Sequence, residues 1–371
     1  MTLRVGLVAR CLNTAHIRGM GKYLFELLQN SSPKQGAEWV LFGDDPRFGM
    51  VIPDGKTLTT DIFEFKGDRF CLWEQMGLPL RAVKHNVDVL HCTEGALSFW
   101  QPKPTVVTIH DTIAWRDRPD TVGAQFYWDT LMPAALRKCA AVITISETSR
   151  ADILARWPWL EHKLCVIPHG IEDAYFTAER SSIPDDLALT IGSAPYLVYM
   201  GGPMERKRFN WAAEVLAKTN HPNLKLIACG FGAEARRTAA DKLPNHLKDH
   251  VHFASFLSDA ELRALYRGAK AVLYPTLYEG FGFPAIEAQA AGVPAIFSAL
   301  GSLQELIGPL AVIVPPNDID AWVAAVSQAM AMGERRAELA QAASNWVKQF
   351  EWKKSFESHL TIYQKVALSS K

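Results

Sequence analysis

Short runs rich in β-branched residues alternate with stretches of helical apolar spacing along the whole chain. This alternation is typical of parallel sheets with helices on both faces, because the chain must cross over between parallel strands. At 371 residues the chain is too long for one ordinary hydrophobic core. We therefore expect two α/β domains, each built on a doubly wound sheet.

The alternation predicts one group of elements in each half of the chain. The strands expected in the first half are Leu3–Ala9, Trp39–Phe42, Val87–His91, Thr105–His110, Ala141–Ile145 and Leu164–Ile167, and the helices include Gly21–Gln29, Thr121–Arg137 and Glu147–Arg156. The strands expected in the second half are Tyr196–Met200, Leu224–Cys229, Val251–Phe253, Ala271–Tyr274, Ala295–Phe297 and Ala311–Val314, and the helices include Trp211–Thr219, Asp259–Arg267, Phe283–Ala291 and Ile319–Met332.

A polar segment, Thr177–Ser193, separates the two halves and lacks apolar periodicity, so it predicts a linker. An aromatic-rich helix from Trp352 to about Val366 follows the second half. This helix is expected to be either the last element of the second domain or a brace packed across the linker. Two such domains would face each other across a cleft lined by the carboxyl ends of their strands, where ligands bind in open α/β sheets.

The charge balance, the cysteine spacing and the lengths of the apolar runs argue against several classes of protein. Lys+Arg and Asp+Glu are equal at 39 each, so no net field favours nucleic acid. The cysteines lack metal-finger spacing and are expected to be reduced thiols of a cytoplasmic protein: Cys11, Cys71, Cys92, Cys139, Cys165 and Cys229. No signal peptide is visible, and no apolar run approaches the ~18 residues of a membrane span.

The segment Glu279–Glu287 is the most informative stretch for function. It follows the strand at Ala271–Tyr274, passes through a turn with two glycines and opens a helix, where Pro284 suits the first turn. Free backbone N–H groups and the helix dipole make such a turn an anion site. The glutamates at its two ends suit hydroxyl groups, so the segment predicts a sugar nucleotide as ligand. The plainer alternative is a helix with an acidic neighbour and an incidental glutamate.

A cluster of cations follows the first strand of the second half, in the run Gly201–Arg208. Arg206 and Lys207 stand beside glycines at a helix entrance, where they would neutralise a diphosphate. A solvated basic turn is the alternative, but the position after a strand favours binding. We expect Arg208 to be a surface residue.

Two further motifs follow strands in the first half. His110 and Asp111 stand at the tip of the apolar strand that begins at Thr105, and the tips of such strands form sites. Structural hydrogen bonding would explain an isolated pair, but alongside the other motifs we expect a functional role for His110. The run Arg18–Tyr23 contains Gly21, which lets backbone approach a phosphate, although a plain tight turn explains it equally well.

No motif predicts a metal. The run Asn317–Asp320 contains an Asp-x-Asp triplet, but it precedes a helix, so we expect helix capping rather than metal binding. The metal-binding HExxH motif, the GxSxG nucleophile motif and the P-loop are absent from the sequence.

Taken together, these residues resemble the family 4 retaining glycosyltransferases of GT-B fold, most of all the bacterial mannosyltransferase-like branch. The resemblance covers nearly the whole chain. Glu279–Glu287 is similar to the family's Glu-x7-Glu signature, Gly201–Lys207 to its G-x-x-x-x-R-K loop, and Ile109–Asp111 to its His-Asp strand tip. Ile145–Arg150 and Ile167–Ile171 also stand where the family has close equivalents.

The resemblance implies a GT-B fold of two Rossmann-like domains facing across a cleft. Residues 1–180 would form the N-terminal, acceptor-binding domain, and residues 190–351 the C-terminal domain that binds the nucleotide sugar. The helix at residues 352–371 would cross back to the N-terminal domain.

The resemblance also implies a role for each matched residue. Arg206 and Lys207 would hold the donor diphosphate, Glu279 the donor-sugar hydroxyls and Glu287 the ribose, while His110 would lie near the hexose. The loop at residues 255–258 would contact the nucleobase. The implied donor-binding residues are Gly21, Arg206, Lys207, Phe256, Leu257, Glu279, Gly280, Phe281, Gly282, Phe283 and Glu287, and the implied catalytic residues are His110, Asp111 and Glu279.

One position departs from the family's pattern. Many relatives carry arginine directly after the glycine of the phosphate loop, whereas this chain has Gly202 there. Either Arg206 compensates for the missing cation or the phosphate is held differently.

The reaction implied is transfer of a hexose from a nucleotide diphosphate sugar to an acceptor hydroxyl, with retention and with no metal or other cofactor, in bacterial surface or exopolysaccharide synthesis. No carboxylate stands out as a nucleophile, so we favour attack on the same face of the sugar as the leaving group. Asp111 is a weaker candidate for an acceptor-side base.

GDP-mannose is favoured over a UDP-sugar as donor, and a saccharide or lipid-linked saccharide is the expected acceptor. The protein would be cytoplasmic, with a peripheral location at the inner face of the membrane as a further expectation. Phe70, Leu72 and Trp73 near Arg69 form a candidate membrane contact, although a buried helix face explains them better.

Three alternatives stay open. A nucleotide-sugar epimerase of the same two-domain fold would need catalytic carboxylates and no acceptor. A nicotinamide dehydrogenase would need Gly-x-Gly-x-x-Gly after the first strand, where Arg18–Tyr23 supplies only Gly-x-Gly. A non-catalytic protein that binds sugar nucleotides is disfavoured by the intact phosphate and carboxylate motifs.

Overall fold

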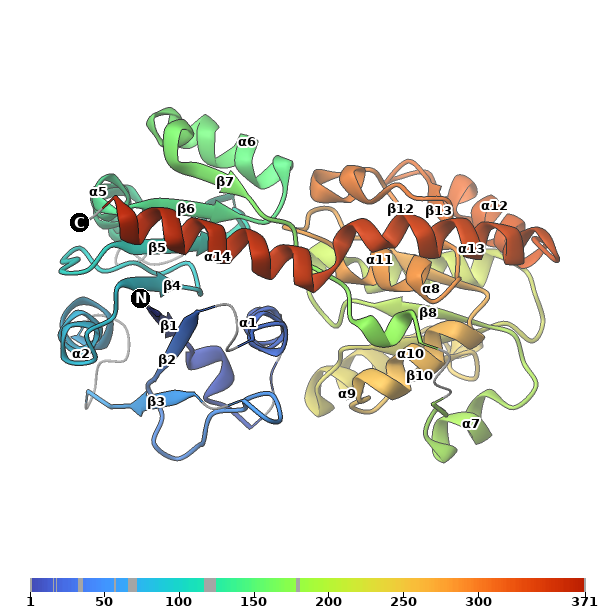
Figure 1. Ribbon diagram of the computed structural model, residues 1–371. Coiled ribbons are helices and arrows are strands. Elements are labelled where there is room, and N and C mark those ends of the chain that lie inside the picture. Colours follow the sequence, from blue (N-terminus) through green and yellow to red (C-terminus); the bar gives the residue numbers. More distant parts are fainter. Residues whose placement is uncertain are drawn as a thin grey trace. The chain divides into compact units, whose positions relative to one another are not determined.

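A computed structural model describes residues 2–15, 17, 19–32, 36–56, 58–65, 72–116, 125–177 and 181–369. The chain forms two compact units (Figure 1). Unit 1 comprises Met1–Gly170 and Phe350–Lys371, and unit 2 comprises Ile171–Gln349. The chain thus enters unit 2 at residue 171, ahead of the segment in which the sequence predicted a linker.

Unit 1 is built on a parallel sheet in which the described strands number seven, in the order β3-β2-β1-β4-β5-β6-β7. The strands are β1 (Leu3–Val8), β2 (Ala37–Gly43), β3 (Thr59–Ile62), β4 (Val89–Cys92), β5 (Thr105–Ile109), β6 (Ala141–Thr144) and β7 (Leu164–Val166). Six of them lie where the sequence predicted strands. Strand β3 was not predicted. It lies at the sheet edge with Thr59 and Thr60 exposed, so its sequence has no apolar pattern.

Helices cover both faces of this sheet, as the alternation of side chains along the strands shows. The side chains of Trp39 on β2 and His91 on β4 point to one face of the sheet and contact α14 (Trp352–Leu368) there. Helix α1 (Met20–Gln29) packs beside α14 on the same face. The sequence neighbours of these two residues face a core shared with α2 (Leu78–Lys84), α5 (Met132–Lys138) and α6 (Glu147–Arg156). Shorter elements of unit 1 are η1 (Arg10–Leu12), η3 (Trp73–Gly77), α3 (Ile113–Arg116), η4 (Tyr127–Leu131) and η5 (Pro158–Lys163).

The helix predicted at Thr121–Arg137 is seen from residue 125, because residues 121–124 lie outside the described ranges. From there η4 and α5 continue it to Lys138. No helix in the described parts of the chain is long and apolar enough to cross a bilayer.

Unit 2 holds a second parallel sheet, with described strands in the order β10-β9-β8-β11-β12-β13. They are β8 (Tyr196–Met200), β9 (Lys225–Cys229), β10 (Val251–Phe253), β11 (Ala271–Tyr274), β12 (Ala295–Phe297) and β13 (Ala311–Ile313). Numbered within each unit, both sheets contain the order 3-2-1-4-5-6 of the Rossmann fold. The prediction of two doubly wound α/β domains is confirmed.

The helices of unit 2 also pack on both faces of its sheet, with α8 and α12 sharing one core and α10, α11 and α13 in mutual contact. The α-helices are α7 (Asp185–Ile191), α8 (Phe209–Lys218), α9 (Ala233–Asp241), α10 (Asp259–Gly268), α11 (Phe283–Ala290), α12 (Ile319–Met330) and α13 (Arg335–Val347). The short 3₁₀ elements are η6 (Asp173–Tyr175), η7 (Glu205–Lys207), η8 (Asn245–Leu247) and η9 (Gly301–Leu306), and η10 (Lys348–Phe350) leads back to unit 1.

Two expectations about loops have clear outcomes. The linker predicted at Thr177–Ser193 is wrong over α7, which buries Leu187 and Ile191 one helical turn apart. The capping role predicted for Asn317–Asp320 is confirmed, because the Asp318 carboxylate accepts a hydrogen bond of 3.0 Å from the Ala321 N–H at the start of α12.

Candidate functional site

The strand order of unit 2 reverses between β8 and β11, and ligands of open α/β sheets bind outside the carboxyl ends of the strands at such a point. The loop after β8 contains Arg206 and Lys207, and the loop after β11 contains Glu279. Two motifs more than 70 residues apart in sequence therefore lie together at the predicted kind of site.

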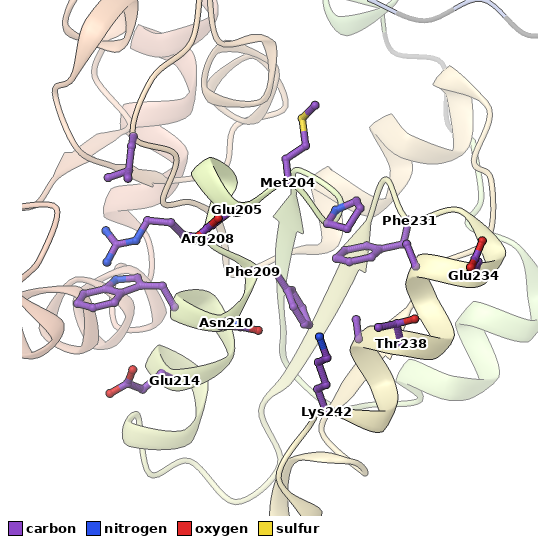
Figure 2. Close-up of a pocket in the computed structure, with 15 residues that line it drawn as sticks. Met204, Glu205, Arg208, Phe209, Asn210, Glu214, Phe231, Glu234, Thr238 and Lys242 are labelled. Atoms are coloured by element: carbon purple, nitrogen blue, oxygen red, sulfur yellow. The ribbon is translucent and has the colours of Figure 1, made fainter. Parts of the chain in front are cut away.

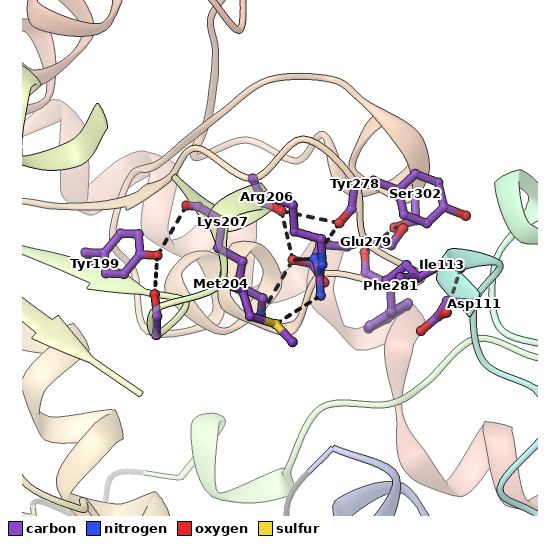
Figure 3. A network of polar contacts seen from close by, with 12 residues as sticks. Asp111, Ile113, Tyr199, Met204, Arg206, Lys207, Tyr278, Glu279, Phe281 and Ser302 are labelled. Carbon is purple, nitrogen blue, oxygen red and sulfur yellow. Dashed lines mark hydrogen bonds and ion pairs between the residues drawn. The ribbon is translucent and has the colours of Figure 1, made fainter. Parts of the chain in front are cut away.

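Glu279 is the centre of a cluster of polar contacts (Figure 3). Its Oε1 accepts hydrogen bonds from Arg206 Nη1 at 2.7 Å and from the Thr276 hydroxyl at 2.9 Å, and Lys207 Nζ lies 3.6 Å away. The three charged side chains are only 12% to 22% exposed, so water screens their attraction weakly. The carboxylate thus holds both cations in place.

The backbone around these cations is held by further contacts. Arg206 Nη1 also donates to the Tyr278 carbonyl at 2.7 Å, and the Leu277 N–H donates to the Arg206 carbonyl at 2.9 Å. The hydroxyl of buried Tyr199 lies 2.9 Å from the carbonyl oxygen of Gly202 and 3.2 Å from that of Lys207. The loop after β8 is therefore tied both to its own strand and to the loop after β11.

The turn before α11 is closely packed and held by hydrogen bonds. Gly282 has a φ of +114°, and a Cβ there would stand 2.4 Å from a methyl group of Leu303, so only glycine suits the position. The Ser302 hydroxyl lies 2.8 Å from the Glu279 carbonyl oxygen and 2.7 Å from that of Phe281. Gly282 caps α11 without a side-chain acceptor, so the positive end of the helix dipole is left to favour an anion at this turn.

Glu287 lies in the second turn of α11 and is buried. Its Oε2 is 3.3 Å from the hydroxyl of Tyr266 on α10. Phe256 and Leu257 follow β10, and the Phe256 side chain is 71% exposed. Because β9 separates β10 from β8, their loop stands about 10 Å along the same sheet edge from the loop after β8.

In unit 1, His110 follows β5 directly, as predicted. Its Nε2 lies 2.8 Å from the Thr93 carbonyl oxygen, to which it must donate, and Tyr23 contacts its ring edge-on at 4.8 Å. Burial lowers the pKa of His110 to about 4. The imidazole is therefore neutral near pH 7, with Nδ1 as the hydrogen-bond acceptor.

Asp111 has a local structural role. Its Oδ1 accepts a hydrogen bond of 2.9 Å from the Ile113 N–H, which begins the short helix α3. This contact satisfies the carboxylate in the way that helix caps do and accounts for an aspartate at this position.

Gly21 lies in the first turn of α1, where a Cβ would stand 2.8 Å from the Cys11 carbonyl oxygen. A close approach of α1 to η1 therefore requires glycine here, whether or not a phosphate binds. Arg18 of the same motif lies outside the described residues.

Sequence reasoning missed an acidic residue at the switch point of unit 1, which lies between β1 and β4. Glu94, just after β4, accepts hydrogen bonds from the Cys11 N–H at 2.8 Å and from Arg10 Nε at 3.1 Å. These contacts fix the loop after β1. Neither Glu94 nor Arg10 belongs to a sequence motif, so only the strand order could have identified this pair.

A hollow of about 740 Å³ opens beside the candidate site, between α8 and α9 (Figure 2). Its wall includes Met204 and Glu205 of the loop after β8, and its floor includes Phe209 and Phe231. None of the three charged residues of the Glu279 cluster lines it. We therefore define the candidate site by the polar contacts at the switch point and not by this hollow.

Two other expectations concern metals and membranes. Among the described residues, no three His, Cys, Asp or Glu side chains gather in a way that could hold a metal ion. Trp73, named as a candidate membrane contact, is fully buried and stacks on Phe63. Phe70 and Arg69 lie outside the described residues, whereas Leu72 is 47% exposed.

Two family models match most of the chain between them. The model described as Glycosyltransferase Family 4 matches residues 17–175, and the model described as Glycosyl transferases group 1 matches residues 189–346. The chain is 28% identical over 287 residues to the MMP alpha-(1->4)-mannosyltransferase of Mycolicibacterium hassiacum, covering 71% of this chain and 65% of that protein.

A second relative is the O-antigen chain mannosyltransferase RfbU of Salmonella typhimurium, 26% identical over 246 residues, with 66% of this chain and 65% of that protein covered. The chain thus spans slightly less than two thirds of the length of these relatives. Among solved structures, HepE of Anabaena in complex with UDP and glucose has a TM-score of 0.73 at 17% identity, with 100% of both chains covered. The chain belongs to the family 4 glycosyltransferases of GT-B fold.

Proposed function

We propose that this protein is a retaining, metal-independent glycosyltransferase that moves a hexose from a nucleotide diphosphate sugar to an acceptor hydroxyl. The observation that carries the proposal is the cluster of Arg206, Lys207 and Glu279 at the switch point of unit 2, beside the N-terminus of α11. Cations and helix N–H groups suit a diphosphate, and a carboxylate suits sugar hydroxyls.

Binding of the donor would exchange the partners within this cluster. The diphosphate would take the two cations from Glu279, and the sugar hydroxyls would satisfy the carboxylate in their place. Because the cations already stand within 4 Å of one carboxylate oxygen, little reorganisation is needed. Glu287 would accept a hydrogen bond from the ribose, and the loop with Phe256 and Leu257 would contact the nucleobase.

In the reaction itself, the bond between the anomeric carbon and the diphosphate oxygen breaks as the acceptor oxygen attacks from the same face. The departing phosphate oxygen takes the proton of the acceptor hydroxyl. Arg206, Lys207 and the N-terminus of α11 stabilise the negative charge that develops on the leaving diphosphate. Glu279 stays a hydroxyl acceptor and is not the nucleophile.

In unit 1, we assign hydrogen bonding to the substrate to His110. Its neutral ring leaves Nδ1 as an acceptor, which suits a saccharide hydroxyl better than a phosphate. Gly21 would let the backbone of α1 approach the donor phosphates. The contact of Asp111 with Ile113 makes it a weaker candidate for an acceptor-side base.

The names of the two mannosyltransferase relatives favour mannose as the hexose, and we propose GDP-mannose as the donor. The relative from Salmonella typhimurium is named for the O-antigen chain, which favours a role in surface polysaccharide synthesis. The acceptor is then a saccharide carried on a lipid, and the protein works in the cytoplasm with peripheral contact at the inner face of the membrane.

The proposal is tested by measuring transfer from GDP-mannose and from UDP-sugars to candidate saccharides by mass spectrometry. Lys207→Ala and Glu279→Gln should each lower kcat/KM on the order of 100-fold, because each removes a group that contacts the reacting part of the donor. Lys218→Ala and Glu338→Gln are matched controls on the exposed surface of unit 2 and should retain the wild-type rate.

Four outcomes count against parts of the proposal. Near wild-type rates for both site variants would remove the cluster from the mechanism. Inversion at the anomeric carbon, seen by NMR of the product, would exclude same-face attack. Strong inhibition by EDTA would contradict the metal-independent reaction, and conversion of the nucleotide sugar without any acceptor would favour the epimerase alternative.

A further inference from the structure

One side of unit 1 exposes a continuous row of apolar side chains. Leu72, Met76, Leu80 and Val83 follow one another at helical spacing along η3 and α2, and each is between 42% and 52% exposed. The opposite side of the same helix buries Trp73 and other core residues. The helix is therefore apolar on both sides, although one of them has no covering in the described structure.

The loop after β4 extends this row. Gln75 Nε2 donates to the Leu97 carbonyl at 3.2 Å, and the Phe99 N–H donates to Gln75 Oε1 at 2.8 Å, so the loop lies against η3. Phe99 and Trp100 in this loop are 43% and 45% exposed.

The segment that begins at residue 125 lies against the same loop. The Leu97 N–H donates to the Tyr127 hydroxyl at 3.0 Å, and the neighbouring Phe126 is 53% exposed. We define the apolar face of unit 1 as Leu72, Met76, Leu80, Val83, Phe99, Trp100 and Phe126. It gathers seven of the ten large hydrophobic side chains that are exposed among the described residues of unit 1.

Cations border this face. Lys84 is exposed at the end of α2. A hollow of about 410 Å³ beside Phe99 is lined by Lys103 and Lys138 and by no carboxylate, and Lys138 Nζ lies 3.4 Å from the centroid of the Phe99 ring.

The three segments that carry this face, residues 72–84, 97–104 and 125–138, hold five Lys or Arg side chains and two carboxylates, Glu74 and Asp129. Asp61 pairs with Arg81 at 3.2 Å, and Asp129 pairs with Arg156 at 2.5 Å. Glu74 is buried, with Arg10 4.0 Å away. The charge that the face presents to a partner is therefore positive.

We propose that the apolar face of unit 1 docks onto the surface of an anionic lipid bilayer. The exposed Leu, Met, Val, Phe and Trp side chains would enter the headgroup region, and Lys84, Lys103 and Lys138 would contact lipid phosphates. This inference rests on the proposed transfer to a lipid-linked acceptor and names the surface that would bring the enzyme to it. An exposed apolar face bordered by cations suits anionic lipid better than a second copy of this chain, whose matching face would bring the same cations together.

The test is co-sedimentation of the full chain with vesicles of phosphatidylcholine alone and with added phosphatidylglycerol. Binding should be strong only with the anionic lipid and should weaken at high salt, since each surface cation adds about fivefold in affinity. The variant Met76→Glu with Leu80→Glu should lose most of the binding. Its matched control, Phe48→Glu with Leu368→Glu, places the same charges on exposed apolar residues outside the face and should bind like wild type.

A gentler variant guards against misfolding. Lys84→Gln with Lys138→Gln leaves the apolar side chains in place and should weaken binding to anionic vesicles on the order of 25-fold, with no change in melting temperature. Equal binding by wild type and both face variants, or no vesicle binding by wild type, would overturn the proposal. So would a wild-type dimer in light scattering that the glutamate variant converts to a monomer without any vesicle binding.

The same variants separate this inference from the proposed function. Transfer to a saccharide acceptor without lipid should be equal in wild type and face variants, because the face lies outside the donor cluster of unit 2. Vesicle binding without any sugar transfer would leave the docking surface standing and reject the proposed reaction.

Discussion

Gly202 shows how one residue can make this chain depart from its family's pattern. Its φ is +67°, and a Cβ there would stand 2.5 Å from the Gly230 carbonyl oxygen. The loops after β8 and β9 therefore approach too closely for any side chain at this position. The arginine of many relatives could be accommodated only if one of these loops moved, which leaves Arg206 and Lys207 as the cations that contact Glu279.

We predict that Gly202→Ala destabilises unit 2 on the order of 1–3 kcal/mol, because it adds strain in the left-handed region to a clash with backbone. Gly232→Ala is the matched control, since φ there is −68° and no atom stands within 4 Å of the added Cβ. Urea unfolding of both variants checks the prediction. Equal stability would show that the two loops can separate easily.

The residues that hold Glu279 were only partly predictable. The two glutamates and both cations stand in recognisable motifs, and the family was identified from them. Thr276 and Ser302 also fix the turn, but each is a single hydroxyl residue with no pattern around it. Their importance arises from the neighbouring strands β11 and β12, so the sheet had to be seen first.

At the scale of elements, a buried group of histidines and tyrosines joins α14 to the rest of unit 1. His359 Nδ1 donates to the Ser355 carbonyl, so Nε2 accepts the Tyr23 hydroxyl at 2.8 Å. Nearby, His91 contacts the hydroxyls of Tyr363 and Thr108 at 2.7 and 2.8 Å. Burial lowers the pKa of His359 to about 4 and that of His91 well below its usual range, so both rings are neutral in the folded protein.

We predict that the protein loses stability as pH falls from about 6.5 to about 4. A histidine with a lower pKa in the folded state binds protons more readily when unfolded, so acid favours unfolding. His359 alone would contribute on the order of 2 kcal/mol at pH 5 relative to pH 7.5. Urea unfolding against pH should give a shallower slope for His359→Gln, and an unchanged slope would show that His359 is not involved.

Most helices and strands could be predicted from local sequence patterns, and there are physical reasons why the others could not. The strands of unit 2 are apolar runs apart from Lys225 and His252, and they were predicted within one residue at each end. Helix α7 was missed because only Leu187 and Ile191 of its seven residues are buried. Similarly, β3 pairs through its backbone at the sheet edge, which requires no apolar pattern.

At the scale of the whole molecule, the two sheets share one strand order, but their chain paths differ. Unit 2 is a single continuous segment, whereas unit 1 needs the segment Phe350–Lys371 to complete it. Within that segment Trp352, Phe356 and Tyr363 are buried, and a Cβ on Gly170 would stand 2.3 Å from the Trp352 backbone.

We predict that truncation after Gln349 unfolds unit 1 and leaves unit 2 folded. The truncation uncovers the face of the first sheet that α14 covers, and the lost side chains would each cost on the order of 3 kcal/mol. Hydrogen exchange should then show lost protection in β1 and β4 and retained protection in β8 and β11. Truncation after Ser369 is the control, and intact protection of β1 after the longer truncation would contradict the prediction.

The split composition of unit 1 also affects the order of events during synthesis. A ribosome releases the first 170 residues early, but the helix that closes their sheet follows the whole of unit 2 in the chain and emerges after it. Unit 2 can complete its core while unit 1 still exposes one face of its sheet. Nascent chains would therefore need protection from aggregation until α14 has emerged, and a chaperone would hold unit 1 longer than unit 2.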